Sequence, residues 1–356
     1  MSVHIFIPDL LRSELLTPEI YRELSLPALE TLLAKGSFSD EKSQGTEAWL
    51  CSAFGVVKQN DWPVAIITLQ VDGAKEAQAK DGYWLRADPV HLRIERNDII
   101  LADSQIFEIS IDEANQFVSA LNYHFSNNRY HSLSSDTEQG KIFFQSIHSD
   151  RWYLHLAHVP NLMTCSLNEV AGKNINDFMP SGADSMTWNT ISNEIQMLLH
   201  EHPLNQAREG RGELPINSVW FWGGGIMPQS FNCPYTHIWS NDTFCRSLAS
   251  ISGINYNTLS DYVDKWSQLA ISGSHLVMIN TLHGRVQYED IHGWQESIKN
   301  LEVNWFAPLL LSLKNGELDQ LIITTTDQNR VKNFSIVSNS LWKFWRTNKS
   351  LSIYAD

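Results

Sequence analysis

Four segments of the chain share one pattern, in which a short apolar run ends at a polar residue or at glycine. The runs are VHIFIPD, which ends at Asp9, NSVWFWGGG, whose glycines begin at Gly223, HLVMIN, which ends at Asn280, and LIITTTDQN, which reaches Asp327. Uninterrupted apolar runs of this length are typical of strands buried on both faces of a mostly parallel sheet. Because ligands of such sheets bind outside the carboxyl ends of the strands, we expect these four ends to meet at one edge.

Segments with helical spacing fit between these strands. SLPALETLLAKG has Ser25 as its predicted N-cap, Pro27 in the first turn and Gly36 as its stop. TWNTISNEIQMLLHEHP repeats apolar residues at helical spacing and stops before Pro203. GWQESIKNLEVNWFAPLLLSLKNG predicts a third long helix, bent or broken near Pro308.

The middle of the chain has a different pattern. From about residue 72 to residue 165, apolar and polar residues alternate, as in YWLRADPVHLRIE, KIFFQSI and RWYLHLAHV. This alternation predicts antiparallel strands, with one helix in SIDEANQFVSALNYHF and a polar loop in NNRYHSLSSDTEQG. The predicted fold class is therefore α/β, a mostly parallel sheet flanked by helices with a smaller inserted α+β domain. The predicted bounds are 1–71 and 166–356 for the core and 72–165 for the insertion.

Composition narrows the partners and the compartment. The 26 Lys and Arg against 40 Asp and Glu give a net charge of −14, which argues against nucleic acid and acidic membranes as partners. No apolar run is long enough to span a membrane, and the N-terminus has no basic leader. The four cysteines are scattered and form no CxxC pair, as expected for reduced thiols. We therefore expect a cytoplasmic protein.

The segment GTEAWLCSAFGV, from Gly45 to Val56, contains a candidate nucleophile. Glycine, Thr46 and Glu47 before an apolar run open a helix, and they place the Thr46 hydroxyl at its positive end. Such a hydroxyl could act as a nucleophile if a metal or a base lowers its pKa. The alternative is that Thr46 only caps the helix.

Three further groups could contact an anion. His202, Asn205 and Arg208 fall broadly on one side of a helix, either as a phosphate clamp or as an ordinary polar helix end. Gly223, Gly224 and Gly225 would let backbone N–H groups approach an anion. Neither GxxxxGK[ST] nor a suitable GxGxxG is present, so we expect no nucleotide cofactor.

Other polar residues have simple structural interpretations as well as functional ones. Arg86 and Asp88 share parity along an alternating segment, so they face one way and would ordinarily form a surface ion pair. Asp9, His283 and Asp327, with Asn280, stand near strand ends, where carboxylates and imidazoles could bind a divalent metal. Single acidic residues at strand ends are also common as caps.

The order of these segments resembles the archaeal-type cofactor-independent phosphoglycerate mutases of the alkaline phosphatase-like superfamily. IFIPDL resembles the family's opening strand, and PALETLLAKG is similar to its helix PNLDRLAREG. GTEAWLCSAFGV aligns without gaps to GSDTAHLAIFGY, which places Thr46 at the nucleophilic serine. RADPVHL resembles RCNFATV, HPLNQAREGRGELPIN is similar to HPVNRERRERGLPPAN, and VWFWGGGIMP resembles LLRGAGK. The resemblance is strongest from His202 to Pro228 and weak after Cys233.

The resemblance implies phosphoryl transfer through a phosphorylated hydroxyl, assisted by two divalent metals. It implies that Thr46 is the nucleophile and that Asp9, His283 and Asp327 are metal ligands. It places Arg86, His202 and Arg208 at positions suited to contact with the substrate and its phosphate. Together with the other candidates for anion contact, the predicted contacts are Arg86, His202, Asn205, Arg208, Gly223, Gly224 and Gly225. The remaining ligands suffice for one divalent ion, Mn²⁺ or Zn²⁺.

Three positions depart from the family's pattern. Asn280 stands where the family has a metal-binding Asp, Gln328 where it has a His, and Leu50 where a His lies inside the nucleophile segment. An amide lacks the charge with which a carboxylate holds a divalent cation, and leucine cannot be a ligand. Two-metal phosphoryl transfer needs both charges.

These departures favour a mutase-like protein with a degenerate metal site, non-catalytic or altered, that binds a phosphorylated small molecule in a regulatory role. One alternative is an active metal-dependent phosphomutase or phosphatase that uses Thr46 as its nucleophile. Another is a structural or interaction protein with a protein partner, for which exposed tryptophans would be the sign. The chain has 13 tryptophans, enough for either outcome.

Overall fold

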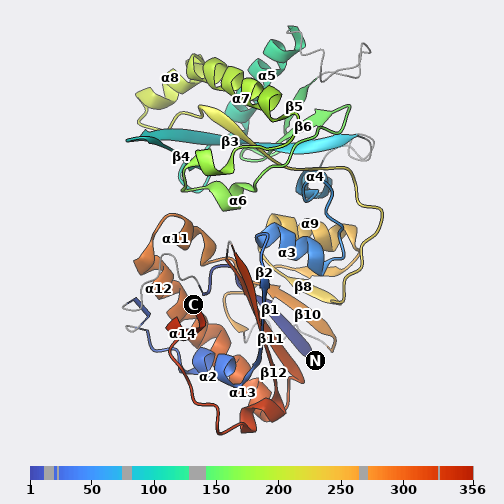
Figure 1. Ribbon diagram of the computed structural model, residues 1–356, viewed down its shortest axis with the longest axis vertical. Coiled ribbons are helices and arrows are strands. Elements are labelled where there is room, and N and C mark those ends of the chain that lie inside the picture. Colours follow the sequence, from blue (N-terminus) through green and yellow to red (C-terminus); the bar gives the residue numbers. More distant parts are fainter. Residues whose placement is uncertain are drawn as a thin grey trace. The chain divides into compact units, whose positions relative to one another are not determined.

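The chain folds as two compact units, each with its own sheet (Figure 1). The first unit consists of Met1–Phe54 and Asn232–Asp356, and the second of Gly55–Phe231. A computed structural model describes residues 1–11, 20–21, 24–73, 82–127, 142–263, 272–327 and 329–355. The second unit is larger than the predicted insertion, because helices and a strand on either side of residues 72–165 pack on its sheet. The polar loop predicted after Asn127 lies outside the described residues.

The first unit is built around a seven-stranded, mostly parallel sheet. β1 pairs in parallel with β10 on one side and with β11 on the other, as predicted for three of the four apolar runs. Among the strands described, only β12 runs opposite to the direction of the other six. In order across the sheet the strands are β2 (Ser37–Lys42), β12 (Arg330–Val337), β11 (Gln320–Thr326), β1 (Ser2–Phe6), β10 (Ser274–Met278), β8 (His237–Trp239) and β9 (Asn255–Asn257). The predicted α/β class is confirmed.

The fourth apolar run is not part of this sheet, and that prediction was wrong. β7 (Ser218–Gly225) pairs antiparallel with β3 (Tyr83–Glu95) in the second unit. Every residue of β7 is buried, because α7 (Ser185–His200) packs on it as well as α4 (Val64–Asp72). Burial on both faces gives an antiparallel strand the continuous apolar sequence that parallel strands usually have.

Helices cover both faces of the first unit's sheet (Figure 1). On one face lie α2 (Pro27–Lys35), α12 (Ile291–Leu301) and α13 (Ala307–Asn315), whose buried residues share a core with Val3 and Ile5 of β1. On the other lie α3 (Thr46–Ala53) and α9 (Thr243–Ile251). Shorter helices are α11 (His283–Gln287), the 3₁₀ helix Ser338–Trp342 and α14 (Ser352–Ala355).

The N-terminus of α2 is capped by a distant residue rather than by Ser25. The N-cap is Leu26, whose side chain makes no capping bond. The carboxylate of Glu302 instead accepts hydrogen bonds from the N–H groups of Ala28 at 2.6 Å and of Leu29 at 3.0 Å. A carboxylate at this position satisfies two helix-end donors and lies at the positive end of the helix dipole.

Glu302 reaches α2 from a π-helical turn, Glu302–Phe306, that joins α12 to α13. Pro308 lies in the first turn of α13. Since proline has no N–H and its ring clashes with the carbonyl four residues earlier, a regular α-helix cannot continue through it. The predicted irregularity near Pro308 is confirmed, and it takes the form of this wider turn.

The second unit contains the antiparallel strands that alternation predicted. Its sheet runs β4-β3-β6-β5, with β7 paired to β3. α5, α7 and α8 lie on one face and α4 on the other (Figure 1). The remaining elements are β4 (Asp98–Ala102), α5 (Ile111–Asn127), β5 (Phe143–Ser146), β6 (Trp152–Leu156), α6 (Leu167–Val170), the 3₁₀ helix Ile175–Phe178 and α8 (Pro203–Gly210). Among the helices described, none is long and apolar enough to cross a bilayer.

Replacing Glu302 tests the distant cap. In Glu302→Ala two buried N–H groups lose their acceptors, so we expect the free energy of unfolding of the first unit to fall by about 3 kcal/mol. The matched control is Glu296→Ala in α12, whose side chain is exposed and should cost well under about 1 kcal/mol. Urea unfolding measures the free energy of unfolding of both variants. Equal losses would contradict a role of Glu302 in capping α2.

Candidate functional site

Strand ends of the first unit bring two of the predicted metal ligands together. Asp9 follows β1, and Asn280 and His283 follow the parallel neighbour β10. Nδ1 of His283 lies 2.5 Å from Oδ2 of Asp9, and the backbone N–H of His283 donates to the carbonyl of Asn280 at 3.3 Å. We refer to this edge of the sheet, beyond β1, β10 and β11, as the rim.

Asp9 is held at the rim by its own backbone. Its φ of 57° is left-handed, a conformation that aspartate adopts more readily than most residues. Its N–H donates to the carbonyl of Thr326 at 2.9 Å, and its carbonyl accepts from Nε1 of Trp294 at 3.3 Å. Asp9 is 5% exposed, so both its backbone and its carboxylate belong to the packed rim.

Asp327 is used differently. Its Oδ1 accepts the backbone N–H groups of Asn329 and Arg330, both at 2.7 Å, and so shapes the turn between β11 and β12. Among the residues described, no group of three or more His, Cys, Asp or Glu side chains could hold a metal ion. Gln328 lies outside the described residues. Of the three predicted ligands, Asp9 and His283 are in contact with each other, whereas Asp327 is bonded to backbone N–H groups.

Thr46 begins α3 at the same edge. The N-cap is Gly45, with a φ of 90° and no side-chain capping bond, so Thr46 is the first helical residue and not the cap. The N–H of Ser43 donates to the carbonyl of Asn329 at 2.8 Å, which places the segment leading into Thr46 beside the turn at Asp327. Thr46 is half-buried, and its role as a nucleophile stays a prediction.

A buried polar chain underlies α3. Trp49 of α3 stacks on Phe6 of β1 with ring centroids 3.9 Å apart, and it makes a T-shaped contact with the ring of His4. Thr324 donates to Oδ1 of Asn333 at 2.6 Å, so its hydroxyl must accept from Nε2 of His4, also at 2.6 Å. Nδ1 of His4 is then the acceptor for the Tyr235 hydroxyl at 2.7 Å. This chain assigns His4 the neutral, Nε2-protonated form.

The second unit contains the predicted phosphate clamp, on the α5 and α7 face of its sheet (Figure 1). His202 caps α8, because its Nδ1 accepts from the N–H of Leu204 at 3.2 Å, and burial lowers its pKa. Nδ2 of Asn205 donates to the carbonyls of Leu199 at 2.7 Å and Ile216 at 2.8 Å. The His202 side chain therefore caps α8, and the Asn205 side chain ties α8 to the end of α7 and to the segment before β7.

Arg208 is buried and directs its guanidinium at protein acceptors. Its Nε donates to the carbonyl of Leu214 at 2.9 Å, and its Nη2 to that of Glu108 at 2.8 Å. Its Nη1 is paired with Glu113 at 3.0 Å. Contact with a phosphate would have to replace these bonds, so that role stays a prediction.

Packing accounts for two of the three glycines at the end of β7. A Cβ at Gly224 would lie 2.2 Å from the hydroxyl of Tyr83, and one at Gly225 would lie 2.5 Å from Cβ of Pro63. Gly223 has a φ of 65°, which favours glycine. The glycines let Tyr83 and Pro63 approach the backbone, whereas their role in anion binding stays a prediction.

Arg86 lies on the opposite face of this sheet, in a buried ion pair with Asp88. Its Nε and Nη2 donate to Oδ1 of Asp88 at 3.0 and 2.7 Å, and Nε1 of Trp222 donates to Oδ2 at 2.7 Å. The two residues share a face, as predicted, but the pair is buried and not on the surface. Burial opposes the charge of Arg86, yet Asp88 outweighs it and raises the pKa of the guanidinium.

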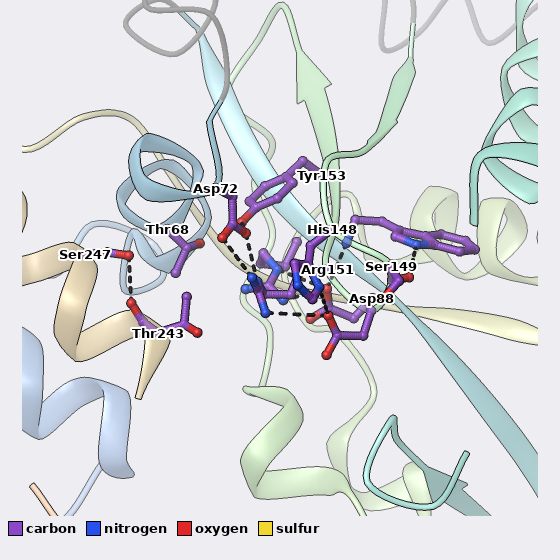
Figure 2. A network of polar contacts seen from close by, with 12 residues as sticks. Thr68, Asp72, Asp88, His148, Ser149, Arg151, Tyr153, Thr243 and Ser247 are labelled. Carbon is purple, nitrogen blue, oxygen red and sulfur yellow. Dashed lines mark hydrogen bonds and ion pairs between the residues drawn. The ribbon is translucent and has the colours of Figure 1, made fainter. Parts of the chain in front are cut away.

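The sequence did not single out three residues that extend this pair into a network (Figure 2). Arg151 donates from Nε and Nη2 to Asp72 at 2.8 and 2.9 Å, and the Tyr153 hydroxyl donates to Asp72 at 2.5 Å. Burial alone would raise the pKa of Asp72, but these hydrogen bonds outweigh it and lower the pKa. The alternation in RWYLHL was the available signal, since it puts Arg151 and Tyr153 on one face.

The chain is similar in sequence and in fold to a small number of known proteins. No protein-family model matches the chain. A 2,3-bisphosphoglycerate-independent phosphoglycerate mutase of Methanosarcina mazei is 28% identical over 159 residues, which are 42% of this chain and 36% of that protein. The protein of the same name from Methanothrix thermoacetophila is 38% identical over 61 residues, 17% of this chain and 16% of its own length. The solved structure of the PH0037 protein from Pyrococcus horikoshii has a TM-score of 0.51 at 12% identity and covers 94% of this chain and 87% of that one.

The mostly parallel sheet, its polar rim and the antiparallel sheet of the second unit make this an α/β protein, and its fold is similar to that of the PH0037 protein. The chain is a divergent relative of the cofactor-independent phosphoglycerate mutases. The matched segments span only about a third and a sixth of the curated relatives. The activity and substrate of those relatives therefore come to this chain as proposals.

The titration of His4 gives a test of the packing beneath α3. Burial lowers the pKa of His4 from 6.5 to about 4, so the unfolded chain binds a proton in this range that the folded chain does not. The stability that neutral His4 contributes is complete above pH 6.5 and is lost as the pH falls toward 4. Relative to His4→Gln, the wild type should lose roughly 3 kcal/mol between pH 7 and pH 4.

Chemical unfolding across this pH range measures the difference. His292→Gln, at an exposed position of α12, is the control for the replacement of a histidine by glutamine. Parallel pH profiles for the wild type and His4→Gln would contradict a buried, neutral His4.

Proposed function

We propose that this chain is a phosphoglycerate mutase-like protein with a degenerate metal site, which binds a phosphorylated small molecule in a regulatory role in the cytoplasm. One observation carries the proposal: the carboxylates that remain at the rim are engaged by the protein's own groups. Asp9 is bonded to His283, and Asp327 closes a turn through two backbone N–H groups.

Metal chemistry supports this reading of the rim. A catalytic metal site in a protein commonly has at least three charged or imidazole ligands around one ion. Asp9 and His283 supply two, and Asn280 contributes at most a neutral amide oxygen. Asp327 would join them only if its carboxylate left the two N–H groups that it accepts. One Mn²⁺ or Zn²⁺ is the most that such a set would hold.

Arg86, which the resemblance to the mutases places near the substrate, has a different neighbour in this chain. The family segment RCNFATV has Asn where this chain has Asp88, directly beside Arg86 in the folded sheet. A carboxylate at 2.7 Å neutralises the guanidinium and occupies the donors that would face a phosphate. Separating a buried pair of this kind costs about 3–5 kcal/mol, so a phosphate would bind Arg86 weakly.

The alternative is an active metal-dependent phosphomutase or phosphatase. The position of Thr46 favours it, because a hydroxyl in the first turn of α3 lies at the positive end of a helix whose approach segment meets the rim. Threonine is chemically competent as a nucleophile, so the replacement of serine does not decide the matter.

Assays of the wild type with Mn²⁺ or Zn²⁺ distinguish the two functions. We expect no interconversion of 2- and 3-phosphoglycerate and no hydrolysis of p-nitrophenyl phosphate above the level of Thr46→Ala. Calorimetric titration should show no tight, stoichiometric metal binding. Asn280→Asp restores one charge, and since even outer-shell partners change metal affinity by about 10–100-fold, metal affinity should rise at least as much.

Two results would contradict the proposal. Metal-dependent turnover that is lost in both Thr46→Ala and Asp9→Ala would establish the alternative. Stoichiometric Mn²⁺ or Zn²⁺ binding that Asp9→Ala and Asp327→Ala both abolish would show that the rim assembles a metal centre after all.

A further inference from the structure

A pocket of about 700 Å³ is formed entirely by residues of the first unit, whereas most of the predicted phosphate contacts belong to the second unit. Its walls come from the end of α2, from β2 and β12, and from the segment that leads into α14. These parts of the chain are far apart in sequence, and β12 pairs with β2 to form one wall. The fold therefore assembles the pocket from several elements.

The lining of this pocket is mainly basic, whereas the chain as a whole is acidic. It contains four basic side chains, Arg330, Lys332, Arg346 and Lys349, and one carboxylate, Asp40. The whole chain has 26 basic and 40 acidic residues. A local excess of basic groups in an acidic protein concentrates anions at that place, because the field near the surface depends on the nearest charges.

Two of the cations are fixed before any ligand arrives. Nη1 of Arg346 donates to the carbonyl of Gly36 at 2.6 Å, through one of the five N–H groups of the guanidinium. Nζ of Lys332 donates to the carbonyls of Tyr354 at 2.8 Å and Ala355 at 2.9 Å, which ties α14 to β12. Cations that are already ordered lose little conformational entropy when an anion binds.

The other two cations are exposed, as Arg346 also is. Arg330 pairs with Asp40 at 2.5 Å, and its side chain is 53% exposed, so an anion can compete for it at little cost. Lys349 is exposed on the same pocket. This differs from Arg86 and Arg208, whose guanidinium groups are buried against protein acceptors.

Aromatic side chains add an apolar wall. Phe38 is 57% exposed and Trp345 is 66% exposed, and both line the pocket. Most tryptophans that the structure describes are buried, whereas Trp342, Phe344 and Trp345 are exposed together in one short segment. Exposed rings beside cations provide contact area for the carbon part of a charged ligand.

We propose that this pocket binds a small phosphate ester, with Arg330, Arg346 and Lys349 around the phosphate and Phe38 and Trp345 against the carbon part. The guanidinium fork matches phosphate geometry, and a dianion matches the excess of positive charge. The inference rests on the proposed function for the class of ligand, and it moves the site from Arg86 and Arg208 to the first unit.

Calorimetry of the full chain tests the pocket with 3-phosphoglycerate and inorganic phosphate. We expect saturable binding to the wild type, weakened about tenfold or more in Lys349→Glu and lost in Arg346→Glu/Lys349→Glu. The matched control is Arg246→Glu/Lys314→Glu, which makes the same change in net charge at exposed positions of α9 and α13. The control should bind within about twofold of the wild type, since surface charges away from the pocket are screened.

Vesicles that contain phosphatidic acid identify the source of the phosphate. Cosedimentation that needs Lys349 and also Trp342, without binding of soluble esters, would assign the pocket to a lipid headgroup and would support it. Soluble binding with no cosedimentation would assign it to a free metabolite and would support it equally.

Failure of the pocket and failure of the proposed function give different results. Phosphate-ester binding that is unchanged in Lys349→Glu and in the double variant would overturn the pocket and leave the proposed ligand class standing. No binding of soluble esters or vesicles to the wild type would overturn both. Lys349→Glu keeps the bond from Arg346 to Gly36, so its thermal stability should match that of the control and separates a binding defect from misfolding.

Discussion

The parallel pairing of β1 with β10 and β11 is the constraint on which the rest of the first unit depends. It brings the carboxyl ends of these three strands to one edge of the sheet, so the residues that follow them start close together. Asp9 meets this constraint with a left-handed backbone that bonds to Thr326 of β11 on one side. On the other side its carboxylate meets His283, beyond β10. The topology of the sheet thus explains why these polar residues lie close together at the rim.

The buried arginines that were predicted to contact a phosphate are paired with acceptors of the protein itself. Arg86 is matched by Asp88, and Arg208 by Glu113 and two carbonyls. Breaking a buried pair costs about 3–5 kcal/mol, which is comparable with the whole binding free energy of a millimolar ligand, about 4 kcal/mol. An exposed pair costs about 1 kcal/mol or less to separate. This difference, rather than the number of arginines, favours the exposed cations beside β12 as the place where an anion binds.

The pattern of apolar and polar residues predicted where strands lie and whether one or both of their faces are buried. Continuous apolar runs indicated strands covered on both faces, and alternation indicated the antiparallel strands of the second unit; both were confirmed. Burial does not say which sheet a strand joins, so β7 was placed in the wrong one. Ser25 was the expected cap of α2, yet the cap is Glu302, which only the folded chain brings near. The network of Asp72, Arg151 and Tyr153 was missed because it joins a helix end to a strand distant in sequence.

The positions of Asp9 and Asp327 at the rim can be explained by their structural contacts, without a metal. Asp327 accepts two N–H groups in the turn that starts β12, so its loss would disturb a strand at the pocket as well as the rim. Asp9 joins three elements through its N–H, its carbonyl and its carboxylate. A carboxylate with such a structural role is explained by the fold alone. Leu50 is buried in the packing of α3, so it too has a structural role. The presence of Asp9 and Asp327 therefore does not by itself argue for a metal-dependent activity.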